Sequence, residues 1–413
     1  MARRNSSRST RPTGGNARQP AGQQSPAESA PADGTEANQA AAPDPRPLAE
    51  LRKLIDGVDA KLVKLLNERA HLVVEVGQTK RSDGTPIYAP HREAEVLSKA
   101  RDRNEGPLQD RTIEGVYREI MSGSFSLEQP LRIGYLGPPG SFSHMAAQKQ
   151  FGSSVAYEDL REIAGVFTEV RRGHVDYGLV PIENSTSGGI VETLDGLITS
   201  GHELSIYAEV QLSVHMALLA NCEPSAVRRV HGKPEALAQC RTWLATQYPT
   251  AEVIPAASSS RGAITAAEEC KLAVSIGAEP GSAAVGPELA GDIYGLKTLF
   301  ARIEDNPNNV TRFVVLSRQH AEPTGDDKTS LMFKTEDKPG ALVAVLNLFS
   351  EAGINLSHID KRPSGRNNWE YTFFVDALAH RTGDTLKRVV GQMAEHCREV
   401  TVLGSYPRNS RIL

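Results

Sequence analysis

The chain has 413 residues, a formal net charge of −4 and 39% hydrophobic residues, which predict two to four domains rather than one small core. The nearly balanced charge provides no overall field for nucleic acid or an anionic membrane, and no run of about 18 apolar residues could span a bilayer. The four cysteines show no CxxC pair and no Cys/His cluster, so we expect reduced thiols in a cytoplasmic protein without metal or cofactor (Cys222, Cys240, Cys270, Cys397).

Residues 1–47 contain no Val, Ile, Leu, Phe, Tyr or Trp, and consist mainly of Ala, Pro, Ser, Gly, Gln and Arg. Such a segment cannot bury enough apolar surface to offset the entropy of ordering it, so it is predicted to be a disordered tail. It has neither the apolar helix face of a transit peptide nor the apolar core of a signal peptide, so targeting is not expected.

Three helices are predicted next. Apolar residues recur at spacings of three and four over 48–80, which predicts a helix of roughly 50 Å, and shorter helical patterns follow at 90–104 and 107–125. Two short helices cannot cover so long an apolar stripe, so we expect a second copy to cover it in a helical dimer.

Cations on the long helix indicate an anion site. Arg69 and Lys80 lie eleven residues apart, about three turns, so both occupy one face with about 16 Å between them. Arg52 lies on a different face and could serve the same ligand only from a partner protomer. The alternative is that all three are solvated charges of an amphipathic helix.

The segments "LRKLIDGVDAKLVKLLNERAHLVVEVGQTK", "HREAEVL" and "YREIMSGSFSLE" resemble the all-helical chorismate mutases, over residues 48–128. The resemblance implies that Arg69 and the partner's Arg52 bind the two carboxylates of chorismate, and that Lys80 donates to its ether oxygen. It adds four further site residues, with Glu93 at the ring hydroxyl (Arg92, Glu93, Ser124, Glu128).

An α/β region follows. Strands are predicted at 131–137 and 175–184, each ending in a Gly-rich turn before a helix, and Ser141 or Ser143 can cap the first of these helices. Further strands are predicted at 208–220 and 272–278, with helices at 234–246 and 260–269. The alternation favours a mostly parallel sheet with helices on both faces, in two lobes. With no Walker lysine and no GxGxxG, nucleotide binding is not predicted.

Five motifs in this region, "GPPGSFSHMAA", "VPIENSTSGG", "HGKPEALAQC", "SAAVGPELAGDIYGL" and "IEDNPNNVTRF", together resemble prephenate dehydratase over 131–317. The resemblance implies two lobes of the periplasmic-binding-protein type with the active site between them. It makes Asn184, Gln239 and Thr311 the catalytic polar set and adds four supporting residues (Glu183, Ser185, Arg312, Phe313).

Two of these supporting residues carry specific expectations. Strand alternation predicts that Thr311 and Phe313 face the substrate together. Arg312 is the candidate for binding the pyruvyl carboxylate, although the same alternation sends it to the opposite face, where its role would be structural.

After a polar linker, the order strand, helix, two strands, helix and strand predicts a ferredoxin-like unit. The run "PGALVAVLNLFSEAGINLSHIDKRP" resembles an ACT domain that senses phenylalanine. The resemblance implies an inter-subunit effector pocket (Gly340, Ala341, Leu342, Val343, Asn355, Leu356, Arg362, Pro363). The usual Glu-Ser-Arg-Pro is Asp360-Lys361-Arg362-Pro363 here, so the alternative is a purely structural dimerisation domain.

The predicted organisation is therefore multidomain. It comprises an all-α mutase domain (48–128), an α/β two-lobed periplasmic-binding-protein-like dehydratase domain (131–318) and an α+β ferredoxin-like ACT domain (328–405). The predicted function is conversion of chorismate to prephenate and of prephenate to phenylpyruvate, with phenylalanine as inhibitor, in a homodimer or higher oligomer. The alternatives are an arogenate dehydratase and a two-lobed ligand-binding sensor.

Overall fold

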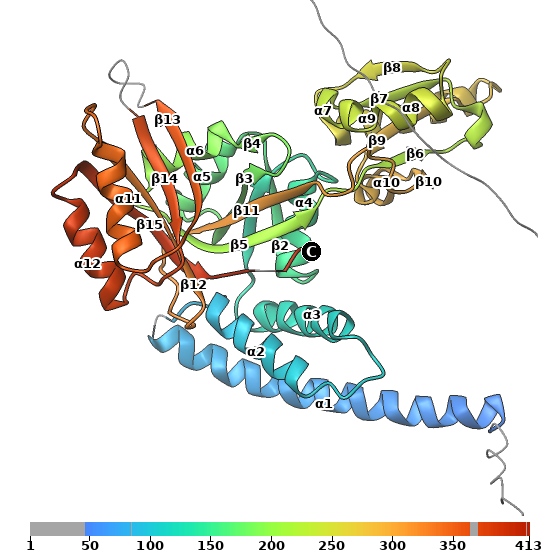
Figure 1. Ribbon diagram of the computed structural model, residues 1–413. Helices are drawn as coiled ribbons and strands as arrows, with labels where there is room; N and C mark the ends of the chain where they lie inside the picture. The colour runs from blue at the N-terminus through green and yellow to red at the C-terminus, as the bar shows by residue number, and fades with distance from the viewer. Residues whose placement is uncertain (1–45, 84, 364–370, 410) are drawn as a thin grey trace, which may run out of the picture. The chain divides into compact units, whose positions relative to one another are not determined.

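A computed structural model of the chain describes residues 46–83, 85–363, 371–409 and 411–413 (Figure 1). The predicted disordered tail lies, up to residue 45, outside the described residues. The chain divides into two units, Met1–Asp59 and Ala60–Leu413. Among the described residues, no helix has the length and apolarity needed to cross a membrane.

The three predicted helices are confirmed as α1 (Leu48–Asp83), α2 (Pro90–Asp102) and α3 (Asp110–Glu128). Within the second unit, α1 exposes large apolar side chains: Leu62, Leu65 and Leu72 are 52%, 60% and 62% exposed. Apolar surface of this extent on one helix is typical of a protein interface.

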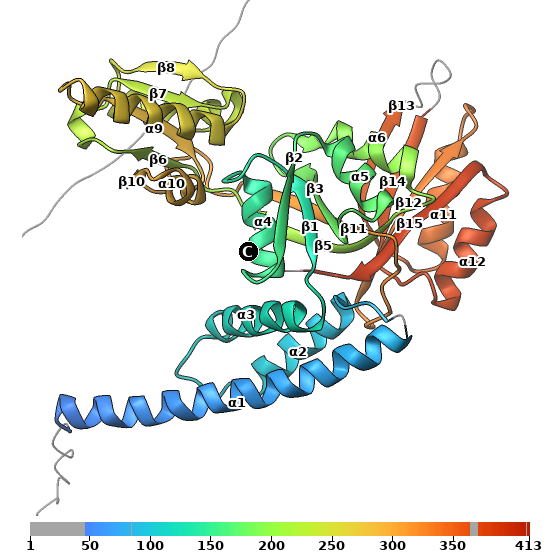
Figure 2. The same cartoon turned by 180° about the vertical axis from the view of Figure 1, so that it is seen from behind.

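The first α/β lobe is a sheet in the order β2 (Ala156–Leu160), β1 (Arg132–Leu136), β3 (Tyr177–Asn184), β11 (Val310–Ser317) and β5 (Ser205–Ser213), with β4 (Gly188–Gly189) beside β3. Helix α4 (Phe142–Phe151) covers one face, capped by the Ser141 side chain as predicted, and α5 (Ile163–Arg172) and α6 (Val191–Ser200) cover the other (Figure 2).

The second lobe has the strand order β10 (Lys297–Phe300), β6 (Ala217–Ala220), β9 (Ser282–Gly286), β7 (Arg229–Gly232) and β8 (Glu252–Pro255). Its helices are α7 (Pro234–Gln239), α8 (Arg241–Gln247), α9 (Ser259–Ser275) and α10 (Glu288–Tyr294), with a short 3₁₀ turn, η1 (Pro224–Ala226). The prediction of two α/β lobes is thus confirmed.

Two predictions for this region are wrong. The segment 272–278 is no strand, because α9 continues through Ser275 on a buried stripe of small residues, and Leu272, Val274 and Ile276 point to solvent. The predicted strand 208–220 is two strands, β5 and β6, which lie in different lobes. Strands β2, β7, β8, β9 and β10 were not predicted at all; β9, for example, consists of Ser, Ala and Gly residues that carry no β-branched signal except Val285.

The sheets are also mixed rather than mostly parallel. In each lobe one strand runs antiparallel to both of its neighbours: β11 between β3 and β5, and β6 between β9 and β10. The reason is that the chain crosses between the lobes twice, once from β5 to β6 and once from β10 to β11, so that a strand enters each sheet from the opposite end.

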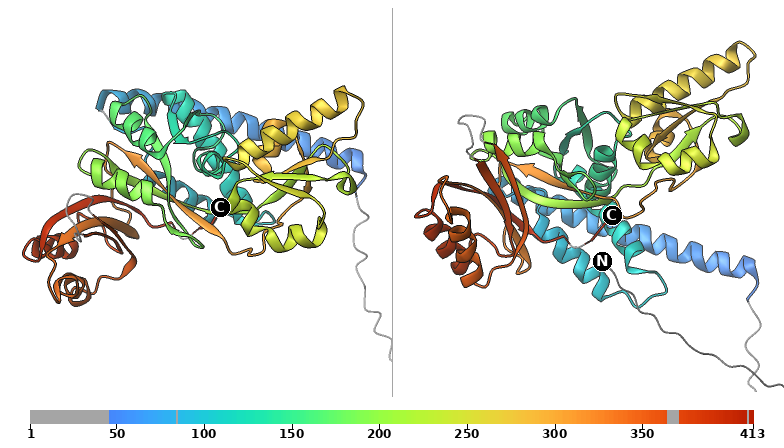
Figure 3. Two further views of the ribbon diagram at one scale, coloured as in Figure 1. Left: turned by 90° about the horizontal axis from the view of Figure 1, so that it is seen from above. Right: turned by 45° about the horizontal axis from the view of Figure 1, so that its top comes forward.

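The C-terminal region forms the predicted ferredoxin-like unit of β12 (Asp327–Thr335), α11 (Ala341–Glu351), β13 (Leu356–Pro363), β14 (Tyr371–Ala377), α12 (Asp384–Met393) and β15 (Cys397–Pro407). The sheet is antiparallel in the order β13-β14-β12-β15. Both helices pack on one face of it (Figure 3). The other face contributes four buried residues to a core shared with α5, α6, β3 and β11 of the first lobe (Met332, Phe374, Leu403, Tyr406).

Tyr88, in the loop between α1 and α2, is buried in the core of the first lobe. Its ring lies edge-on to Phe151 and Tyr177, with centroids 5.0 and 5.3 Å away. The hydroxyls of Tyr177 and Tyr207 donate hydrogen bonds to its carbonyl oxygen at 3.2 and 3.0 Å. The loop after α1 is therefore fixed to the α/β region by both packing and hydrogen bonds.

Candidate active sites

Four of the predicted mutase residues meet where the end of α3 packs against α1. The Lys80 ammonium donates to Glu128 Oε2 at 2.9 Å and to the carbonyl oxygen of Ile87 at 3.0 Å, and Arg69 donates to Ser124 Oγ at 2.7 Å. Glu128 is only 6% exposed, so its carboxylate depends on Lys80 for charge compensation. Gly77 permits this approach, because a Cβ there would lie 3.0 Å from Glu128 Cγ.

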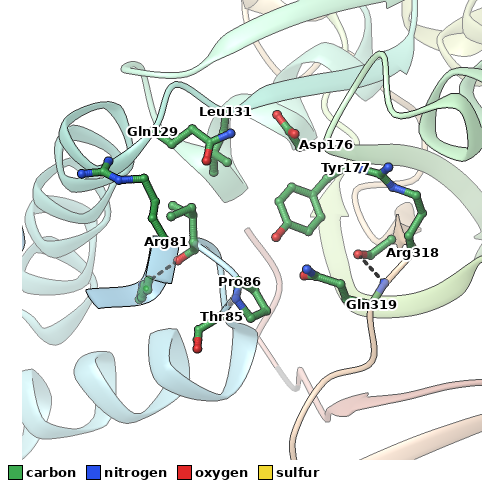
Figure 4. A pocket seen from close by; sticks show the side chains of 12 residues that line it. Arg81, Thr85, Pro86, Gln129, Leu131, Asp176, Tyr177, Arg318 and Gln319 are labelled. Carbon is green, nitrogen blue, oxygen red and sulfur yellow. Dashed lines mark hydrogen bonds between the residues drawn. The ribbon is translucent and has the colours of Figure 1, made fainter. Parts of the chain in front are cut away.

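A pocket of about 480 Å³ adjoins this group (Figure 4). Lys80 and Arg81 line it from α1, and Tyr177, Arg318 and Gln319 line it from the α/β region. Arg81 itself donates to the backbone carbonyl oxygen of Glu128, so this guanidinium fixes the end of α3 against α1.

Arg92 and Glu93 do not join the Lys80 group, contrary to the prediction. Arg92 is exposed and pairs with Glu95 on its own helix. Glu93 instead turns toward α4, where Gln150 donates to its carboxylate at 2.9 Å and the Arg118 guanidinium lies 3.7 Å away. The cause is the buried Tyr88, which holds the start of α2 against the α/β region. Arg52 lies in the first unit, and its contribution from a partner remains a prediction.

Burial raises the pKa of Glu93 to about 6, although Arg118 and the hydrogen bonds from Tyr88 and Gln150 lower it. Because the ionised form is disfavoured in the fold, the stability linked to this group is complete below pH 4.5 and is lost as the pH rises through about 6. Glu93→Gln is therefore expected to increase the free energy of unfolding by about 2 kcal/mol at pH 8 and by close to nothing at about pH 3.5. Urea denaturation at both pH values measures this, with the exposed Glu95→Gln as control. An equal gain at both pH values would contradict the burial argument.

The predicted dehydratase residues form a hydrogen-bonded chain that joins the two lobes. Asn184 at the end of β3 is the register partner of Thr311 at the start of β11. Its Nδ2 donates to Thr311 Oγ1 at 2.9 Å and to Asn309 Oδ1 at 2.8 Å, and Asn309 Nδ2 donates to Gln239 Oε1 of α7 at 3.1 Å. Asn309 is thus a site residue that the prediction missed. The available signal was its spacing of two from Thr311, which places both side chains on one face of a strand.

The loop after β3 fixes the orientation of the Asn184 amide. Its Oδ1 accepts hydrogen bonds from the backbone N–H groups of Thr186 and Ser187 at 3.0 and 3.1 Å, so its Nδ2 is the end that faces Thr311. Ser185 supports the loop by accepting from the N–H of Val310 at 3.0 Å. Since Thr311 Oγ1 accepts from Asn184, the Thr311 hydroxyl proton remains available for another acceptor.

Arg312 and Phe313 lie outside the cleft, so two expectations need correction. The Arg312 side chain is 10% exposed and faces the C-terminal sheet, which supports the structural alternative. Phe313 is 1% exposed and lies in the core beneath α4, and the pairing of β11 with β3 shifts register between Arg312 and Phe313. Phe313 therefore supports the strand from below instead of facing the substrate beside Thr311. Glu183 lies 3.7 Å from the Arg312 guanidinium, on the same side as Arg312.

The predicted effector residues are separated within one chain. Gly340 precedes α11 with a left-handed φ of 82°, and Asn355 and Leu356 follow its other end. An 11-residue helix spans roughly 16 Å, so a pocket that uses both ends requires a second copy, as the resemblance implied. Arg362, at the far end of β13, forms a two-point ion pair with Asp195 of α6 at 2.7 and 2.9 Å.

Among the described residues, no group of three or more His, Cys, Asp or Glu side chains could hold a metal ion. All four cysteines of the chain are free thiols (Cys222, Cys240, Cys270, Cys397).

Comparisons with known proteins match each of the three regions to a protein family. Family models match as chorismate mutase type II at residues 51–129, prephenate dehydratase at 133–321 and ACT domain at 329–394. The bifunctional chorismate mutase/prephenate dehydratases of Stutzerimonas stutzeri and Pseudomonas aeruginosa are 39% and 38% identical, each over 87% of this chain and 98% of the relative. The solved prephenate dehydratase of Arthrobacter aurescens, in complex with L-Phe, is 32% identical with a TM-score of 0.58, over 67% of this chain and 90% of that one. The chain therefore belongs to the family of bifunctional chorismate mutase/prephenate dehydratases.

Proposed function

We propose that the Lys80 group rearranges chorismate to prephenate, and that the Asn184–Thr311 group converts prephenate to phenylpyruvate. The observation that carries this proposal is the hydrogen-bonded chain from Gln239 through Asn309 and Asn184 to Thr311, which supplies neutral donors from both lobes at one place. The expected boundaries of the three domains, 48–128, 131–318 and 328–405, are part of the same proposal.

The mutase step needs no acid, base or nucleophile. A Claisen rearrangement requires a compact substrate conformer and stabilised negative charge on the ether oxygen as its C–O bond breaks. Arg69 and the partner's Arg52 hold the two carboxylates, and the Lys80 ammonium donates to the ether oxygen. Lys80 is already fixed by Glu128 and by the Ile87 carbonyl, so its position requires little reorganisation on binding.

Glu128 accepts a hydrogen bond from Lys80 in the free enzyme, and it can donate to the substrate only once it is protonated. Mutase activity is therefore expected to decline as the pH rises. Glu128→Gln supplies an amide donor at every pH and is expected to flatten this profile. The measurement is mutase kcat/KM from pH 5 to 9 for both chains. A variant whose profile still falls as steeply as the unmodified enzyme's would remove Glu128 from this role.

In the dehydratase step, the ring carboxylate leaves as CO₂, its bonding electrons enter the ring, and the C4–O bond breaks as hydroxide departs. Hydroxide is a poor leaving group, so the site must supply a proton or a strong hydrogen bond at that oxygen. Thr311 can do so because its oxygen already accepts from Asn184 and its proton points elsewhere. Asn184 and Gln239 are neutral and therefore do not stabilise the carboxylate that has to lose its charge.

Since the Arg312 side chain faces the C-terminal sheet, it is not proposed as the cation that binds the pyruvyl carboxylate.

The regulatory and quaternary parts of the proposal rest on separate observations. The Arthrobacter aurescens dehydratase was solved in complex with L-Phe, which supports phenylalanine as the effector of the ACT domain. The exposed leucines of α1 support a homodimer through this helix, in which each chain lends Arg52 to the other's site. A location in the cytoplasm is proposed on the chemistry alone, since the substrates are small metabolites.

The deciding experiment incubates the full chain with chorismate and follows prephenate and then phenylpyruvate, with and without phenylalanine. We expect both products in sequence, and loss of the second with phenylalanine present. A parallel assay with arogenate tests the alternative amine substrate. Binding of prephenate without turnover would instead identify a ligand-binding sensor and refute the proposed dehydratase.

A further inference from the structure

The ACT sheet is joined to the dehydratase by a shared core. Met332, Phe374, Leu403 and Tyr406 project from the sheet face opposite α11 and α12 and are buried with residues of α5, α6, β3 and β11. A rearrangement of the ACT sheet therefore cannot occur without displacing side chains that pack against the strands of the active site.

A buried ionic cluster lies beside this core. The Arg312 guanidinium donates to Glu209 Oε2 and to the Tyr406 hydroxyl, each at 3.0 Å, and lies 2.5 Å from Asp376 Oδ2. Lys328 donates to the same Glu209 oxygen at 2.8 Å. Burial lowers the pKa of Arg312, but the neighbouring Tyr406, Asp376 and Glu209 raise it overall, so the guanidinium stays charged. The cluster thus pairs two cations with two carboxylates across the junction, one cation and one carboxylate from each side.

Strand β13 adds a second set of contacts. Alternate residues of this strand face the dehydratase, while Ser357, Ile359 and Lys361 between them are exposed. His358 lies 3.3 Å from Glu183, and Arg362 pairs with Asp195. The Asp360 carboxylate occupies the space where a Cβ at Gly189 would lie.

One dehydratase residue in the buried ionic cluster and one in the contacts of β13 are sequence neighbours of the proposed catalytic residues. Arg312 directly follows Thr311, and Glu183 directly precedes Asn184. Glu183 also joins the two sets, since its carboxylate lies 3.7 Å from Arg312 and 3.3 Å from His358. The hydrogen bond between Asn184 and Thr311 is therefore bracketed by two residues that each contact a side chain of the ACT domain.

From these contacts we infer that Arg312 and Glu183 are positioning residues through which the ACT domain controls the Asn184–Thr311 pair. The inference rests on the proposed phenylalanine effector and specifies its route. A shift of the ACT sheet moves Asp376 and His358, which displaces Arg312 and Glu183 and separates Asn184 from Thr311. Effector binding inhibits because it favours the state with this separated geometry.

Asp376→Asn tests the route, because it keeps the side-chain volume and removes the charge that faces Arg312. Asp384→Asn is the matched control, an identical change in the same domain at the exposed start of α12. For each chain, dehydratase kcat and KM are measured without and with saturating phenylalanine, and phenylalanine binding is measured by calorimetry. We expect Asp376→Asn to bind phenylalanine yet retain more than about half of its uninhibited kcat/KM, while Asp384→Asn is inhibited like the unmodified enzyme.

Full inhibition of Asp376→Asn with phenylalanine bound would overturn the inference. If Asp376→Asn does not fold, His358→Ala replaces it in the same assays, since that side chain is partly exposed and lies outside the buried cluster. No binding heat with the unmodified enzyme would instead overturn the effector assignment on which the coupling rests, so the two failures are distinguishable.

Discussion

Thr311→Ala is expected to lower dehydratase activity by about 10²- to 10⁴-fold, because the departing hydroxide loses the hydroxyl donor that Asn184 holds in place. Mutase activity in the same chain is expected to remain unchanged, since no mutase residue contacts Thr311 in the described structure. Chorismate supplied to this variant therefore accumulates as prephenate. Following prephenate and phenylpyruvate in one reaction measures both steps.

Thr311→Ser is the matched control, because it keeps the hydroxyl at the register position opposite Asn184 and removes one methyl group. We expect this variant to retain most of its dehydratase activity. If Thr311→Ala still forms phenylpyruvate near the rate of the unmodified enzyme, the hydroxyl takes no part in the departure of water. If Thr311→Ser fails as badly as Thr311→Ala, the residue matters for packing.

The second large effect is expected at Lys80. Removing its ammonium deletes the donor to the ether oxygen and should lower mutase kcat by about 10²- to 10³-fold. A single Lys80→Met change would leave the buried Glu128 carboxylate unpaired, so the tested chain carries Lys80→Met together with Glu128→Gln. Dehydratase turnover of supplied prephenate shows whether the variant chain is still folded. The control for the mutase assay is the chain with Glu128→Gln alone. Mutase activity equal to that of the Glu128→Gln chain would exclude Lys80 as the donor to the ether oxygen.

Mixing two inactive chains tests the shared site. In a mixed dimer of Arg52→Ala with the Lys80→Met chain, one site has Arg52 and Lys80 intact. The other site lacks both residues. The intact site takes Lys80 and Glu128 from the Arg52→Ala chain, so random exchange should restore about a quarter of the activity of the unmodified enzyme. No recovery after verified exchange would place Arg52 outside its partner's site.

Sequence reasoning succeeded where the signal is local to one strand or helix. The three N-terminal helices follow from periodicity, and the ferredoxin-like unit follows from the order of its elements. Asn184 and Thr311, which the resemblance to prephenate dehydratase implied, are register partners on two strands. It failed where a residue distant in the sequence determines the partners of a side chain. Strand alternation did place Arg312 on the face opposite Thr311, but nothing near it in sequence identifies Glu209, Asp376 and Tyr406 as its partners.

Glu93 illustrates the same limit in the helical region. The resemblance implies a substrate contact, yet the buried Tyr88 holds the start of α2 so that Glu93 accepts from Gln150, 57 residues away on a helix of another domain. Strand β9 fails for a different reason, because its five residues are small and fully buried and present no alternating pattern. Long-range packing therefore accounts for the errors at Arg312 and Glu93, and the lack of a local pattern accounts for β9.

The buried Tyr88 changes where this protein can be divided. The match to chorismate mutase ends at residue 129, but the physical border does not, because Tyr88 supplies a ring and a carbonyl acceptor to the interior of the following region. A fragment that begins after residue 129 would have a hole lined by Phe151, Tyr177 and Tyr207. The loop after α1 thus supplies part of the interior of the dehydratase region.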